Sequence, residues 1–110
     1  MRIRGICERA DSPQPLGPDV VVPETVPLTV NFDLADPVGW ATLTRAPNGD
    51  ILAGADIFPG SVTERLIRRH LVPYFSVGAI AKPGEPPVIC RLAISESNAD
   101  PDLPPYEVSE

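Results

Sequence analysis

The chain has 110 residues, which is enough for one domain with a modest core and too few for two. Fifteen residues are proline and the formal net charge is −6. Prolines interrupt regular structure, and a negative chain lacks the basic surface that phosphates require, so nucleic acid is not an expected partner. No apolar run approaches the roughly 20 residues that cross a bilayer, and the start lacks the long apolar region of a signal peptide. We therefore expect no membrane partner and synthesis in a cytoplasm.

Metal-binding and redox residues are scarce. The chain holds two cysteines and one histidine, too few for a convincing zinc site. Cys7 and Cys90 lie far apart in the sequence and are expected to be reduced, buried, apolar side chains. The sequence therefore predicts no metal, no cofactor and no small-molecule substrate.

The two ends of the chain differ from its middle. Residues 1–10 alternate weakly between polar and apolar and predict an N-terminal strand. Residues 11–25 are rich in proline and predict an extended arm. Residues 96–110 hold five acidic residues and no basic one, and this second arm can order only by lying on another surface. The arm residues that we expect to contact a partner are Pro13, Pro15, Pro18, Val20, Val22, Leu103 and Tyr106.

Residues 26–95 carry the patterns of a β-sheet core. From Val26 to Leu34 every second residue is apolar, which is the period of a strand with one buried face. The turn sequence Pro-Asn-Gly-Asp at 47–50 joins the next two strands, so 26–58 predicts a three-stranded antiparallel meander. Two further strands are expected at 74–81 and 88–94.

One helix is predicted at 61–72, between the third and fourth main strands. Ser61 and Glu64 have the spacing of a capping box, and Pro73 ends the helix. Its apolar side is expected to hold Leu66, Ile67, His70 and Leu71. Its basic side is either solvated or a surface for an acidic partner, and consists of Arg65, Arg68 and Arg69. The predicted fold is mainly β: a small antiparallel barrel or curled sheet of five to six strands, one short helix and extended proline-rich arms.

Residue chemistry alone does not define an active site. A nucleophilic serine needs a base within hydrogen-bond reach. The candidate serine is Ser76, and the single histidine, His70, lies six residues earlier across Pro73. The aspartates of the core fall at strand ends and turns, where aspartate is common for local backbone reasons.

Three segments of the chain carry motifs in an informative order. Residues 27–33 read Pro-Leu-Thr-Val-Asn-Phe-Asp and are followed by Pro-Val-Gly-Trp-Ala at 37–41. These residues resemble the segment around the catalytic histidine of the family of tailed-phage prohead (head-maturation) serine proteases. Residues 75–80, Phe-Ser-Val-Gly-Ala-Ile, resemble its nucleophile strand, and 92–101 resemble its last strand. The resemblance covers residues 26 to about 101 and implies a protease-derived fold.

The chain departs from that family at the residues that would perform catalysis. The family's histidine falls on Phe32, and its acidic residue falls on Ala93, while only the serine is kept, at Ser76. Phenylalanine cannot accept a proton, and loss of a triad member lowers the rate by orders of magnitude. The resemblance therefore implies a pseudo-protease that no longer cuts.

The expected function is that of a phage virion structural protein. A minor capsid, decoration or cement protein would bind the major capsid protein, and a second copy of itself, on a capsid assembled in the host cytoplasm. Two alternatives stay open. One is a head-maturation protease that uses Ser76 with His70 or Asp33. The other is a transient, scaffold-like assembly factor.

Overall fold

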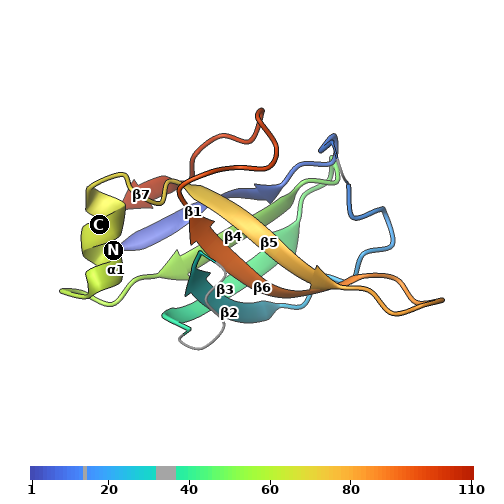
Figure 1. Cartoon of the computed structure of the whole chain (residues 1–110), viewed down its shortest axis with the longest axis horizontal. Coiled ribbons are helices and arrows are strands. Elements are labelled where there is room, and N and C mark those ends of the chain that lie inside the picture. Colours follow the sequence, from blue (N-terminus) through green and yellow to red (C-terminus); the bar gives the residue numbers. More distant parts are fainter. Residues whose placement is uncertain (14, 32–36) are drawn as a thin grey trace.

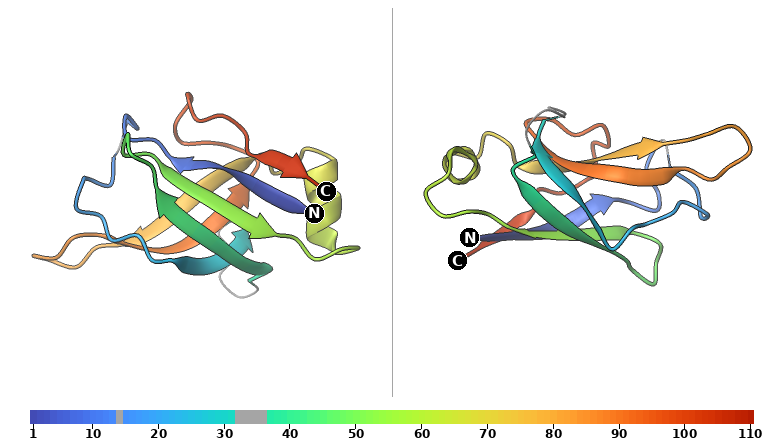
Figure 2. Two further views of the ribbon diagram at one scale, coloured as in Figure 1. Left: turned by 180° about the vertical axis from the view of Figure 1, so that it is seen from behind. Right: turned by 90° about the horizontal axis from the view of Figure 1, so that it is seen from below.

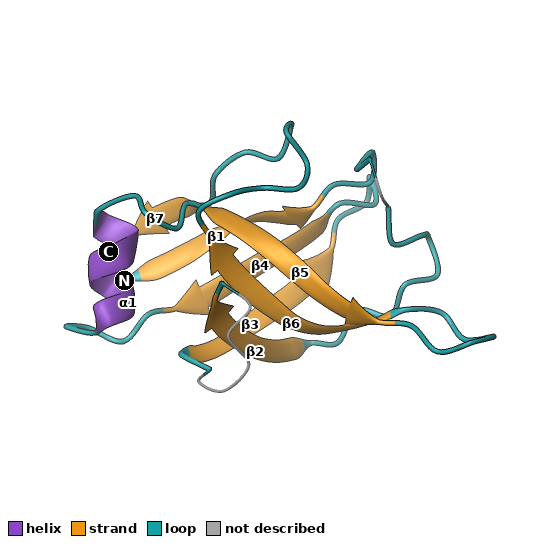
Figure 3. Ribbon diagram, viewed as in Figure 1, coloured by secondary structure: helices purple, strands orange, loops and turns teal. Residues whose placement is uncertain are grey.

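A computed structural model describes residues 1–13, 15–31 and 37–110 (Figure 1). It contains seven strands and one helix, in the order β1 Arg2–Glu8, β2 Thr25–Val30, β3 Gly39–Arg45, β4 Ile51–Asp56, α1 Val62–Arg68, β5 Tyr74–Ile80, β6 Val88–Ser95 and β7 Glu107–Ser109. Figure 3 shows that the strands form the body of the molecule and that the helix lies at one end.

All seven strands belong to one curled sheet. Their order is β5-β6-β2-β3-β4-β1-β7, and every pairing is antiparallel except the parallel pair β2–β6. The sheet curls until β5 comes close to β1, so that β5 and β6 lie over β1 and β4 (Figure 2). The mainly β fold, its curled sheet and the antiparallel meander β2-β3-β4 confirm the expectation from sequence.

The core lies inside this curl. It is made of side chains at alternate strand positions, because successive residues of a strand point to opposite faces. The fully buried large side chains are Ile3, Leu28, Ile51, Phe75, Ile89, Leu92 and Ile94.

The helix is shorter than predicted. It begins after Ser61, whose hydroxyl accepts a hydrogen bond from the Glu64 amide (3.1 Å), and it ends at Arg68. The prediction of helix to residue 72, with His70 on a buried face, was wrong. His70 has φ of +57° and is exposed, because the chain turns there before Pro73 instead of at it.

The C-terminal arm is the source of the additional strand. β7 pairs with β1 through Val108 and Ile3, while the Tyr106 amide donates to the Pro73 carbonyl oxygen (3.1 Å). Tyr106 and Leu103 are buried in the protein's own core. The arm therefore orders by lying on its own domain.

The N-terminal arm is also attached to the domain. Val20 is buried, and Val21 exchanges backbone hydrogen bonds with residues at the start of β6, donating to Pro87 (2.9 Å) and accepting from Ile89 (3.1 Å). Arg45 of β3 donates to the Val20 carbonyl oxygen (2.8 Å).

Candidate functional site

The serine of the nucleophile-like segment lies on β5, beside β6 and then β2. Ser76 pairs with Ala93 across the antiparallel β5–β6 ladder, and Ala93 pairs with Thr29 across the parallel β6–β2 ladder. Directly paired residues point to the same face of a sheet. The structure thus places Ser76, Ala93 and Thr29 in one row across three neighbouring strands.

Neither neighbour of Ser76 in this row provides a base that could accept its proton. Ala93 is 0% exposed and contributes only a methyl group. Thr29 is also buried, and its hydroxyl donates a hydrogen bond to the Asn31 carbonyl oxygen (2.7 Å). The Asn31 amide in turn donates to the Ile94 carbonyl oxygen (2.8 Å), which holds the end of β2 against β6. The next position, Phe32, and the alternative partner Asp33 lie outside the described residues.

The remaining candidate base, His70, lies outside the three strands of this row. His70 follows the C-terminal end of α1 and is exposed, four residues before the start of β5 at Tyr74. Its backbone amide donates to the Ile67 carbonyl oxygen (3.0 Å). Among the described residues, no hydrogen bond joins the His70 side chain to Ser76.

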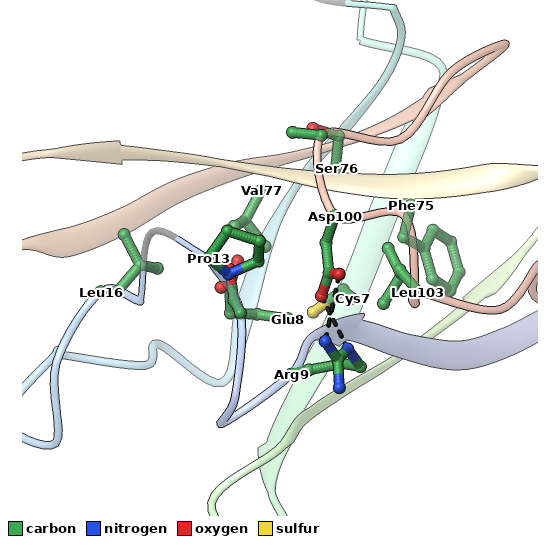
Figure 4. Close-up of a pocket in the computed structure, with 12 residues that line it drawn as sticks. Cys7, Glu8, Arg9, Pro13, Leu16, Phe75, Ser76, Val77, Asp100 and Leu103 are labelled. Carbon is green, nitrogen blue, oxygen red and sulfur yellow. Dashed lines mark hydrogen bonds and ion pairs between the residues drawn. The ribbon is translucent and has the colours of Figure 1, made fainter.

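A pocket of about 340 Å³ lies beside β5. It is formed by the end of β1, part of the N-terminal arm, β5 and the C-terminal arm (Figure 4). In Figure 4 Val77 and Phe75 extend to the side of β5 where Glu8 and Cys7 lie, whereas Ser76 extends to the other side. The Glu8 carboxylate is therefore not placed to act as a base for Ser76.

An ion pair closes one wall of this pocket. Arg9 donates two hydrogen bonds to Asp100, at 2.7 Å and 3.1 Å, and both side chains are largely buried. The guanidinium lowers the pKa of Asp100, and the Asp102 amide, which also donates to that carboxylate (3.0 Å), adds to the effect. This bidentate pair joins the end of β1 to the C-terminal arm and is a structural contact.

Sequence reasoning missed this pocket and its charged residues. Arg9 and Asp100 are separated by 91 positions, and no local pattern signals a contact over that distance. The Cys7 thiol is also in the pocket wall, where burial raises its pKa to about 12 and its Sγ lies 3.4 Å from the Ile51 carbonyl oxygen. Such a thiol is not a reactive nucleophile, because the thiolate is disfavoured.

The carboxyl group of Glu8, in the pocket wall, has a raised pKa that can be tested through the pH dependence of stability. Burial raises the pKa of its carboxyl group, so the folded protein binds this proton more tightly than the unfolded chain does. That contribution to stability is present below the ordinary pKa of glutamate and is lost as pH rises through the folded-state value.

We therefore expect Glu8→Gln to raise the melting temperature at neutral pH and to change it little near pH 3, where the carboxyl group is protonated in both the folded and the unfolded chain. Thermal unfolding at the two pH values checks this expectation. Asp11→Asn, at a neighbouring exposed position, removes the same charge and serves as the control. A lower melting temperature of Glu8→Gln at neutral pH would show that the carboxylate stabilises the fold.

The predicted contact residues of the arms divide by burial. Pro13, Pro15 and Pro18 are exposed, Val22 is half-buried, and Val20, Leu103 and Tyr106 are buried in the chain's own core. Of these residues, the exposed prolines are the ones whose side chains are available to a partner.

The basic residues of the helix remain on the surface. Arg65, Arg68 and Arg69 are exposed. Arg68 forms ion pairs with Glu64 (3.7 Å) and with Glu110 of the C-terminal arm (2.9 Å). Glu110 of the acidic arm thus pairs with a basic residue of the chain's own helix.

Two further observations limit the chemistry of the described part of the chain. Across residues 1–13, 15–31 and 37–110, no three His, Cys, Asp or Glu side chains gather in a way that could hold a metal ion. In the same residues, no helix has the length and apolar character needed to cross a bilayer.

Comparison with known proteins identifies the class of fold. No family model matches the chain, and no curated protein sequence does. Among solved structures, a crystal structure of the Kaposi's sarcoma-associated herpesvirus protease, in complex with an allosteric inhibitor, superimposes with a TM-score of 0.65. The match covers 98% of this chain and 78% of the protease chain, at 15% sequence identity. The chain therefore has a viral protease-like β fold, and at this identity the likeness concerns the fold alone.

Proposed function

We propose that this protein is a non-catalytic virion structural protein, a minor capsid or decoration protein that binds the major capsid protein of a tailed phage. The observation that carries the non-catalytic part is the row across β5, β6 and β2. Ser76 faces the methyl group of Ala93, and the Thr29 hydroxyl beyond it is bonded to the backbone. A serine hydroxyl without a base is a weak nucleophile.

The resemblance to prohead proteases supports the capsid part of the proposal. The histidine-like, serine-like and last-strand segments occur in the order of that family, and the structure places the described parts of all three on adjacent strands. A fold that acts on capsid protein can keep its affinity for that protein after its catalytic residues are lost. The exposed prolines of the N-terminal arm suit a wide, shallow contact, since stiff segments lose little entropy on docking.

A fluorophosphonate probe, which labels activated serines covalently, tests the non-catalytic part. We expect no label on the wild-type protein, and no difference between wild type and Ser76→Ala in any processing of the capsid protein. A serine protease treated in parallel serves as the positive control for the probe. Labelling of the wild type that disappears in Ser76→Ala would favour the second candidate, a head-maturation protease.

Mass spectrometry of purified particles tests the capsid part. We expect many intact copies of this chain per particle, counted against the major capsid protein. Absence from mature particles, together with presence in immature heads, would instead favour a transient, scaffold-like assembly factor.

A further inference from the structure

The exposed apolar side chains of the described residues gather mainly at the two ends of the long axis. The molecule measures 43 × 28 × 21 Å. At one end, beside the β5–β6 hairpin, the exposed residues are Val21, Ile80 and Val88. At the other end, beside α1, they are Trp40, Phe58, Val62, Leu71 and Val108. Exposed apolar surface of this kind marks interaction sites.

The end beside α1 carries a groove. Trp40, at the start of β3, is 66% exposed, and Phe58, after β4, is 77% exposed. Both line one groove of about 480 Å³, together with Val38 and Pro59. Well-exposed tryptophan and phenylalanine side chains are the residues that dominate binding energy when a partner covers them.

Charges of both signs lie in the same groove. Arg2 and Asp56 line it and form an exposed ion pair (3.1 Å). An occupant that brings one cation and one anion beside its apolar contacts would therefore be complementary to the groove.

A segment with one cation, one anion and apolar residues lies at the opposite end of the same molecule. The loop between β5 and β6 reads Ala-Lys-Pro-Gly-Glu-Pro-Pro at 81–87, and its residues 81–86 are exposed. It projects beyond the body of the protein at the end opposite α1, in both Figure 1 and Figure 2. Its base is held by the backbone hydrogen bonds that Val21 makes with Pro87 and Ile89.

We propose that the 81–87 loop of one copy docks in the Trp40–Phe58 groove of a second copy. The loop is a turn in which the Glu85 amide donates to the Lys82 carbonyl oxygen (3.0 Å), and its prolines restrict the backbone further. A loop that is already ordered loses little conformational entropy on docking. Lys82 and Glu85 of the loop supply the cation and the anion that suit Asp56 and Arg2. This inference stands apart from the proposed capsid binding, because it rests on different residues.

The contact joins copies head to tail. Loop and groove lie at opposite ends, so each copy keeps one free loop or one free groove after docking, which produces a ring or an open chain. One short loop buries much less than the roughly 1,600 Å² of a standard stable interface. Self-association is therefore expected to be weak in dilute solution and to become appreciable at roughly 0.1–1 mM, as on a crowded surface.

Two complementary variants test the arrangement. Trp40→Ala removes the largest side chain of the groove and leaves the loop unchanged. Pro83→Ser/Pro86→Ser changes the loop and leaves the groove unchanged. We expect wild type to form species larger than a dimer in sedimentation velocity as its concentration rises, and each variant alone to stay monomeric. An equimolar mixture of the two variants should form a 1:1 complex and nothing larger.

Matched controls separate the contact from general effects. Pro47→Ser changes an exposed proline in the other hairpin, and Leu52→Ala shortens an exposed apolar side chain outside the groove, so both should associate as wild type does. Circular dichroism of every variant confirms folding. Trp40 is the single tryptophan, and its emission should shift to the blue as wild type associates.

Three results would overturn the proposal. Wild type that stays monomeric at about 1 mM shows that the ends do not bind each other. Association that persists in Trp40→Ala shows that another surface is used. A mixture of the two variants that forms no complex shows that the loop and the groove are not partners.

Discussion

Replacing Tyr106 by alanine is expected to destabilise the protein by about 3–5 kcal/mol, the usual range for a large buried aromatic side chain. Tyr106 is 8% exposed, although it belongs to an arm that follows the last core strand. Its ring packs against Phe75 of β5, with ring centroids 4.9 Å apart. Its hydroxyl donates to the Val72 carbonyl oxygen, and its amide donates to Pro73.

This residue connects the C-terminal arm to the segment between α1 and β5. Because the arm also provides β7, loss of the Tyr106 ring should release β7 from β1. Urea unfolding monitored by circular dichroism checks the expected change, and amide hydrogen exchange at Val108 reports the release of the arm.

Two variants make the result specific. Tyr106→Phe keeps the ring and loses the hydroxyl bond, so it should cost only about 1–2 kcal/mol. Val108→Ala changes an exposed side chain of the same arm and should stay within about 0.5 kcal/mol of wild type. A Tyr106→Ala protein as stable as Val108→Ala would contradict the anchoring role.

The same burial raises the pKa of the Tyr106 hydroxyl to about 12. The unfolded chain then loses this proton first, so stability falls as pH rises above about 10, the ordinary value for tyrosine. Tyr106→Phe should weaken that alkaline loss without removing it, since the buried Cys7 thiol also has a raised pKa.

Local patterns were sufficient to predict most strands of this fold. The alternation that begins at Val26 and the turn at 47–50 act between residues that are close in the chain, and the antiparallel meander follows from them. The helix was predicted too long because apolar spacing continues past Arg68, while the backbone turns at His70. Spacing records which residues could share a face, but not where the chain leaves the helix.

Local sequence patterns could not predict the contacts between distant segments. The parallel pairing of β2 with β6 and the bond between Arg9 and Asp100 depend on how the sheet curls. The resemblance assigned the family's serine to Ser76 and its acidic residue to Ala93, and the structure pairs these two positions across β5 and β6. Leu103 and Tyr106 were expected to contact a partner, but both side chains are buried in the chain's own core, because composition cannot show which surface an arm lies on.

At Gly5, strand propensity favours a larger residue such as valine, whereas the tertiary structure leaves no room for one. It lies inside β1, opposite Ala53 of β4, where valine would ordinarily be favoured over glycine. A Cβ at this position would lie 3.0 Å from the Cα of Tyr106 and 3.3 Å from its Cβ. The close contact is with backbone, which cannot move unless the C-terminal arm moves with it.

Gly5→Val is therefore expected to destabilise the protein by about 3 kcal/mol, in spite of the gain in strand propensity. Gly39→Val is the matched control, because among the described residues a Cβ there meets only the Asp56 carbonyl oxygen, at 3.8 Å, an ordinary contact distance. Urea unfolding of both variants gives the comparison. If Gly5→Val and Gly39→Val were equally stable, the arm would not be packed closely against β1.

A double-mutant cycle with Tyr106→Ala then identifies the origin of the effect. If Gly5→Val acts by displacing the docked arm, it should cost much less once Tyr106→Ala has already released that arm, so the two changes should not add. Additive effects would place the strain elsewhere in β1, for example against Phe75, whose Cε2 would lie 3.7 Å from the new Cβ. The size of this coupling thus measures how firmly the arm is held against β1.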